Sequence, residues 1–173
     1  MNIWRHRRIF FNSNSTKMKK AFLTLASVFV MTLSYSQSLK EEVQIFQNVF
    51  GKEKKATAAQ FIKIEDAAKK DAFWALYDAY ETERKALGEK RIALVSAYAA
   101  NYNSLTDDKI EAILMQSVKV NEGLENLVIK YYKKMKKPVG IKTAAQFAQV
   151  ENYFLAAVRY ELSAQLPFIG ERK

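Results

Sequence analysis

The chain has 173 residues, 49% of them hydrophobic, and carries 28 basic against 18 acidic side chains, a net charge of +10. It has no cysteine and a single histidine, His6, which excludes a cysteine nucleophile, a disulfide and a zinc site of the usual Cys/His kind. The length suits one domain together with processing segments.

The N-terminal part has the pattern of an export signal. A short basic start at residues 18–20 is followed by an apolar run from Ala21 to Leu33 and by small residues at Ser34 and Ser36. This order is typical of a secretory signal peptide, and the run is shorter than the roughly 20 apolar residues of a membrane span. We therefore predict a signal peptide over residues 18–36, cleaved after Ser36, and a periplasmic or secreted protein. An uncleaved signal anchor is the alternative.

Residues 1–17 fit this scheme in two ways, as an over-extended start with Met18 as the true start, or as a long basic n-region. Residues 1–36 hold six basic residues and no acidic one. Removing those six from the 28 leaves 22 basic against 18 acidic residues, a net charge of +4. The charge that would suggest nucleic-acid binding is therefore largely a property of the targeting segment. His6 is removed as well, so no Ser-His-Asp triad can form in residues 37–173.

Residues 37–173 are predicted to form one helical domain. Two prolines and five glycines in the whole chain are few, helix-forming residues are abundant, and no alternating strand pattern is present. The expected elements are a helix over 39–50 ended by Gly51, a second segment beginning near Thr57, a long helix over 66–101, a helix over 107–136 stopped by Pro138 and Gly140, and a helix over 143–165 ended by Pro167.

Apolar residues recur every three or four positions along these helices, as one buried stripe requires. The stripe of the helix over 66–101 includes Phe73, Tyr77 and Tyr80, and that of the helix over 107–136 includes Leu114 and Val118. Short connections favour antiparallel neighbours. The fold class expected is all-α, an elongated antiparallel helical hairpin or bundle of about four helices, with a homodimer as one way to cover any exposed stripe.

The pentapeptide Thr-Ala-Ala-Gln-Phe occurs at residues 57–61 and again at 143–147. Thr-x-x-Gln fits a capping box, so we expect each copy to begin a helix. The residues that follow the two copies differ, which does not support a duplication.

Two stretches are candidates for partner contact. In residues 73–84, "FWALYDAYETER", Trp74 lies off the main apolar stripe and either packs against a second element or forms part of a binding surface. The second stretch is the basic run of five lysines within residues 130–137. It either contacts anionic partners, such as acidic unfolded segments, lipid head groups or cell-wall polymers, or it complements the dipole at a helix C-terminus. The candidate contact residues are Trp74, Tyr77, Tyr80, Arg84, Lys130, Tyr131, Tyr132, Lys133, Lys134, Lys136 and Lys137.

Chemistry-bearing motifs are few. Three carboxylate pairs lack the spacing of a calcium-binding EF-hand loop and are expected on solvated helix faces. These pairs are Glu65/Asp66, Glu81/Glu83 and Asp107/Asp108. No glycine-rich phosphate loop or nucleophile motif is present, so we expect no enzyme, no cofactor, no metal and no nucleic-acid partner. Membrane contact is expected only through the signal peptide or a weak surface attraction.

Residues 73–84 resemble the long helix of the Spy/CpxP-type periplasmic helical proteins, the LTxxQ-motif family, and in particular diverged relatives described as sensors of ECF-type sigma factors. "LTDDK" at 105–109 is similar to the LTxxQ motif with Lys109 in place of Gln, and residues 131–169 are similar to the family's C-terminal helix pair. The resemblance covers roughly residues 64–169. It implies a dimer of long hairpins that forms a cradle, which binds unfolded proteins without ATP or restrains an envelope stress sensor. Metal binding, found in some members, is not expected without histidine.

These observations predict an exported helical binding protein, chaperone-like or stress-sensor-like, that holds non-native or regulatory protein partners on an amphipathic cradle. The alternative is a structural adaptor that binds one specific envelope partner.

Overall fold

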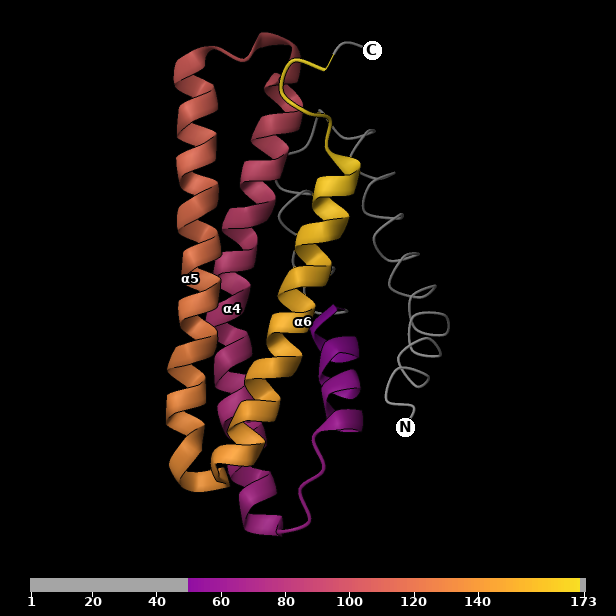
Figure 1. Ribbon diagram of the computed structural model, residues 1–173, viewed down its shortest axis with the longest axis vertical. Helices are drawn as coiled ribbons and strands as arrows, with labels where there is room; N and C mark the ends of the chain where they lie inside the picture. The colour runs from indigo at the N-terminus through magenta and orange to yellow at the C-terminus, as the bar shows by residue number, and fades with distance from the viewer. Residues whose placement is uncertain (1–49, 172–173) are drawn as a thin grey trace, which may run out of the picture. The chain divides into compact units, whose positions relative to one another are not determined.

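The computed structural model describes residues 50–171, which contain four helical stretches and no strand. Residues 50–61 are helical and are followed by three long helices, α4 (Ala67–Asn101), α5 (Asp107–Val139) and α6 (Ile141–Gln165). A short 3-10 turn, η1 (Tyr102–Ser104), joins α4 to α5. Figure 1 shows that α5 runs antiparallel to both α4 and α6. The all-α prediction is confirmed.

The predicted ends of the long helices agree with the structure within a few residues. Asp66 caps α4, accepting a hydrogen bond from the backbone N–H of Lys69 at 2.9 Å. Thr106 holds the N-cap position of α5 without a side-chain cap bond, and Asp107 and Asp108 in the first turn complement the helix dipole. The helix α5 continues past the predicted end at residue 136, because the chain leaves it only at Gly140, whose φ of 88° suits glycine.

Three predictions about helix boundaries are wrong. Gly51 does not end a helix, since residues 50–61 form one helical stretch and an internal glycine costs a helix only about 1 kcal/mol. The first Thr-Ala-Ala-Gln-Phe copy therefore lies in the last turns of that stretch, which ends at Phe61. In the second copy Thr143 is the third residue of α6, because the turn at Gly140 lets the helix begin at Ile141. The predicted helix over 39–50, apart from its last residue, and the predicted signal segment lie outside the described residues.

Buried apolar side chains are distributed unevenly along the helices. All but one of those in the described part of the chain lie in residues 50–87 and 120–155, which we call the closed half. Tyr80 lies at its centre, with its ring edge-on to Tyr131 of α5 at 5.5 Å and to Phe147 of α6 at 5.1 Å. In the closed half, residues 50–61 complete the packing around these three helices.

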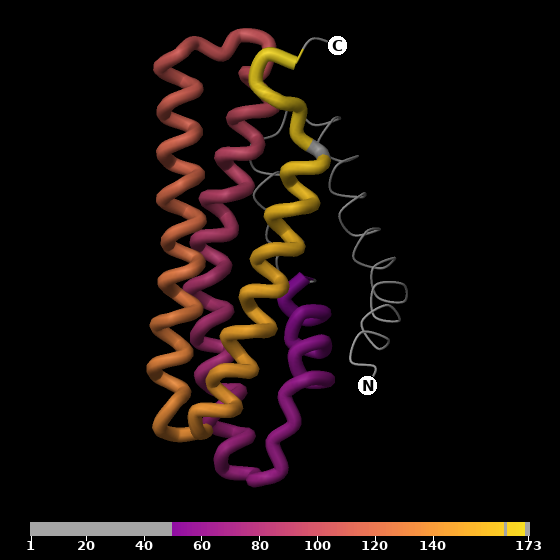
Figure 2. The backbone as a smooth tube through the Cα atoms, viewed as in Figure 1, coloured from indigo at the N-terminus to yellow at the C-terminus, as the bar shows by residue number. Residues whose placement is uncertain are grey.

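The remaining residues, 88–119 and 156–171, form what we call the open half, at the opposite end of α4, α5 and α6 (Figure 2). Tyr98 is the one buried apolar residue in this half of the described chain. Several other apolar side chains there are only half-buried: Ile92, Leu94, Val95, Ile110, Ile113, Val158, Leu162 and Leu166. The same three helices thus enclose a core at one end and leave much of their apolar surface uncovered at the other.

A C-terminal turn closes the end of the open half. The backbone N–H of Glu171 donates to the carbonyl of Phe168 at 3.0 Å, and Gly170 has the positive φ, 79°, that a type II turn needs at its third residue. The hydroxyl of Tyr98 donates to the carbonyl of Pro167, and that of Tyr102 to the carbonyl of Phe168, both at 2.7 Å. The turn is therefore fixed to the end of α4 and to η1.

Candidate functional site

The residues predicted from sequence to contact a partner do not form one surface. Four of them, Tyr77, Tyr80, Arg84 and Tyr131, are buried. Their burial corrects the expectation that they contact a partner: their spacing places them on the faces of α4 and α5 that pack inside the closed half.

Trp74 is half-buried and packs inside the protein. Its ring lies edge-on to Phe73 at 4.9 Å and to Tyr77 at 5.3 Å, and the Lys55 ammonium lies 5.3 Å from its centroid. Lys55 also forms an ion pair with Asp78 of α4. Of the two roles considered for Trp74, the structure therefore shows packing against a second element, the helical stretch 50–61.

Most of the predicted basic run is exposed. Lys130 forms an ion pair with Glu83 at 2.6 Å, and the hydroxyl of Tyr131 donates to the same carboxylate at 2.8 Å. These two hydrogen bonds lower the pKa of Glu83, while burial together with the bond to Glu83 raises the pKa of Tyr131 to about 12. Tyr132 is half-buried. The remaining members of the run, Lys133, Lys134, Lys136 and Lys137, are exposed on α5.

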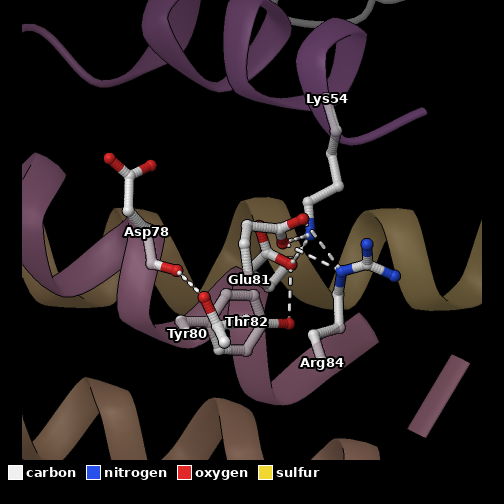
Figure 3. Close-up of polar contacts among 7 residues, drawn as sticks. Lys54, Asp78, Tyr80, Glu81, Thr82 and Arg84 are labelled. Carbon is white, nitrogen blue, oxygen red and sulfur yellow. Dashed lines mark hydrogen bonds and ion pairs between the residues drawn. The ribbon is translucent and has the colours of Figure 1, made fainter. Parts of the chain in front are cut away.

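The sequence interpretation missed a buried ionic cluster in the closed half. Lys54, only 2% exposed, reaches from the stretch 50–61 to Glu81 of α4 and to Glu151 of α6, with 2.7 Å between Nζ and the Glu151 Oε2. The hydroxyl of Tyr80 donates to the same Oε2 at 2.7 Å. Arg84 Nε donates to both carboxylate oxygens of Glu81, at 2.9 and 3.0 Å. Figure 3 shows Lys54 and Arg84 converging on Glu81.

Charge is balanced within this cluster, since two cations face two carboxylates, as burial requires. Burial alone would raise the pKa of Glu81, but the charges of Lys54 and Arg84 outweigh it and hold that pKa below its usual range. Burial, reinforced by the nearby Glu151, raises the pKa of Tyr80 far above its usual range, so its hydroxyl remains a donor. The cluster therefore joins three helical elements in one fixed arrangement.

The arrangement is structural in character. Every member of the cluster is buried, and its charged groups pair with one another inside the closed half. A signal for the cluster was present in the sequence, because Glu151 falls on the apolar face of α6, four residues after Phe147 and three before Phe154. Lys54 gave no such signal, because it lies in the charged run 52–55.

Exposed apolar side chains form the remaining candidate site. Leu114 (57% exposed), Met115 and Val118 (40%) lie within one turn of each other on the outer face of α5 in the open half. The expectation that Leu114 and Val118 belong to the buried stripe is therefore wrong. The C-terminal turn, which is bonded to α4 and η1, presents two further exposed apolar side chains in the open half, Phe168 (78% exposed) and Ile169.

The described residues contain no group of three or more histidine, cysteine, aspartate or glutamate side chains arranged to hold a metal ion. Among the helices of residues 50–171, none combines the length and the apolar character needed to span a bilayer. Comparisons with family models, with curated proteins and with solved structures gave no match to this chain.

Proposed function

We propose that the chain is an exported, non-enzymatic helical binding protein of the Spy/CpxP kind, which holds apolar segments of non-native or regulatory protein partners on its open half. One observation carries this proposal: among the described residues of the open half, only one apolar side chain is buried, while several others are exposed. Contiguous exposed apolar surface on a folded protein marks an interaction site more often than chance.

The open half suits weak and adaptable binding. Leu114, Met115 and Val118 provide apolar area, and methionine adapts its shape to different partners. Glu111 and Lys119 lie exposed beside them on α5 and give the patch a polar rim of both signs. Contact of this kind needs neither ATP nor a cofactor, since apolar burial alone supplies the attraction.

An aggregation assay with an unrelated unfolded protein tests the proposal. We expect the chain beginning at Gln37 to slow aggregation at equimolar concentration, and the substitution Val118→Asp, combined with Met115→Asp, to abolish this effect. Ile129→Asp is the matched control, because Ile129 is 48% exposed on the same helix but lies in the closed half. An aggregation curve unchanged by the wild-type chain, or an equal loss in the control, would show that the open half does not hold unfolded proteins.

A second candidate function, an adaptor for one envelope partner, is favoured by the C-terminal turn. Phe168 and Ile169 are exposed on a backbone that Tyr98 and Tyr102 already hold in place, and a preorganised contact suits one specific partner. A photo-crosslinking residue at position 168 tests it in cells. A single crosslinked product that disappears with Ile169→Asp supports the adaptor, whereas many products support the general holder.

A further inference from the structure

Exposed lysines gather at the end of the closed half. There the chain enters α4, and α5 turns into α6 through the single residue Gly140 (Figure 1). We call this end the basic tip and define it by exposed Lys63, Lys69, Lys70, Lys136, Lys137 and Lys142 with the exposed Ile141. The acidic side chains nearest along the chain are Glu65, Asp66 and Asp71, of which Asp66 is engaged in capping α4.

Helix stability accounts for only some of these lysines. Lys69 lies at the third position of α4 and Lys142 at the second of α6, and neither helix has an acidic residue in its first turn. The positive end of a helix dipole disfavours cations at such positions. Lys136 and Lys137, in the last turn of α5, do complement a dipole, and Lys63 donates to the carbonyl of Ala59 near the end of the stretch 50–61, at 3.1 Å.

Ion pairing does not account for them. Among the described residues, Lys54, Lys55 and Lys130 each contact a carboxylate, whereas no lysine of the basic tip has one within ion-pair distance. The tip therefore carries six lysines against three nearby acidic side chains, an excess of positive charge without direct ion pairs.

An exposed apolar residue lies beside these lysines, at the turn between α5 and α6. Gly140, with φ of 88°, reverses the chain in one residue, so that Val139 is buried while Ile141 is 64% exposed. Ile141 is flanked in sequence by Lys142 and, across the turn, by Lys137. An exposed apolar side chain with lysines on both sides of it in sequence can enter the boundary between lipid head groups and acyl chains, while the lysine ammonium groups stay at the head groups.

We propose that the basic tip docks the molecule end-on against an anionic lipid bilayer, with Ile141 entering the head-group region and the lysines contacting lipid phosphates. The exposed lysines of the tip lie near three helix ends: the start of α4, the end of α5 and the start of α6. A flat, deformable bilayer can contact all of them at once, whereas a single extended peptide would reach fewer of them. This inference goes beyond the proposed function. It would orient the open half, with Asp107, Asp108 and Glu171 at its end, away from the negatively charged surface.

Vesicle co-sedimentation tests the proposal, with the chain beginning at Gln37 so that the apolar run 21–33 cannot itself insert. This chain retains every residue of the described core. We expect binding to vesicles of phosphatidylcholine with phosphatidylglycerol, little binding to phosphatidylcholine alone, and loss of binding as salt increases. Lys137→Gln with Lys142→Gln should weaken the partitioning roughly 30-fold, and Ile141→Ser about fivefold.

The matched control is Lys90→Gln with Lys119→Gln, which removes two exposed lysines from the open half and changes the net charge equally. The control should bind like wild type, and circular dichroism should show all variants folded. Equal weakening in tip and control variants, or absence of wild-type binding at low salt, overturns the proposal. The proposal is also overturned if the wild type and Ile141→Ser bind soluble polyglutamate equally well and the wild type does not bind vesicles. That result would identify the tip as a site for polyanions. Aggregation suppression should be unchanged in the tip variants, which separates this result from the proposed function.

Discussion

The closed and open halves are built from the same three helices, yet only the closed half has a dense core. The difference lies in what packs against α4 and α6: in the closed half the stretch 50–61 adds a fourth helical layer, and Lys54 joins Glu81 to Glu151 across it. In the open half the described residues supply no such layer. Amphipathic helices therefore specify where a core is possible, and the number of elements that meet decides whether it forms.

This contrast assigns different tasks to the two ends. Buried apolar area provides most of the folding free energy, so stability should reside in the closed half. Regions with few buried contacts open at lower free energy, which suits surfaces that accept varied partners.

The largest expected effect is the loss of Lys54. Lys54→Ala leaves the buried carboxylates of Glu81 and Glu151 without their shared cation, which should lower the free energy of unfolding by about 3–5 kcal/mol. Urea unfolding followed by circular dichroism measures this change. Lys52→Ala, at an exposed position of the same stretch, should change it by less than about 0.5 kcal/mol. If the free energy of unfolding of Lys54→Ala lies within about 1 kcal/mol of the wild-type value, the ionic cluster does not account for the greater stability expected of the closed half.

Hydrogen exchange compares the halves directly. Backbone amides of α5 in residues 111–118 should exchange at least about tenfold faster than those in residues 124–135, because only the latter cover a dense core. Nuclear magnetic resonance or mass spectrometry of exchanged peptides resolves both segments of one helix. Uniform protection along α5 would contradict the division into a closed and an open half.

Acid should weaken the closed half through Glu81. Since Lys54 and Arg84 lower the pKa of Glu81 in the folded state, the unfolded chain binds more protons at acidic pH. Its contribution is therefore complete above the ordinary value of 4.5 and is lost as the pH falls through the lower folded pKa. The free energy of unfolding, measured as a function of pH, should decrease as the pH falls below 4.5. The slope should be smaller in Glu81→Gln and equal to that of the wild type in Glu89→Gln. Equal slopes in all three chains would rule out this role for Glu81.

The smallest expected effect concerns the C-terminal turn. Tyr98→Phe removes the hydrogen bond to the carbonyl of Pro167 and should lower the free energy of unfolding by about 1 kcal/mol. The same change should raise the proteolysis rate after Phe168, which a time course with chymotrypsin measures. Unchanged proteolysis would mean that the tyrosine hydroxyls do not fix the turn.

The sequence was sufficient for the long helices because their signals are local. Apolar residues repeat with the helical period, Asp66 caps α4, and Gly140 separates α5 from α6. The same local signals failed at Thr57 and Thr143, where a capping-box pattern occurs inside helices. A cap pattern describes what a helix start would need, but neighbouring propensity and the turn at Gly140 decide where the start lies.

The candidate site was harder to predict because it depends on which apolar helix faces pack against another helix. Tyr77 and Tyr80 were predicted both in a buried stripe and as contact residues, and only their burial is confirmed; Leu114 and Val118 were predicted in a buried stripe but are exposed. Leu114 and Val118 are exposed because, among residues 50–171, no fourth element packs against α5 in the open half. The spacing of apolar residues along one helix does not reveal which other helices cover that face.

The bond between Lys54 and Glu151 joins residues that are 97 positions apart. During synthesis, the lysine leaves the ribosome well before the carboxylate that it needs, so the closed half cannot assemble until almost the whole chain has been made. Arrest of translation before Glu151 should leave the nascent chain without its native core. Such late closure is compatible with the export that we propose, in which the polypeptide would cross a translocation channel before it folds.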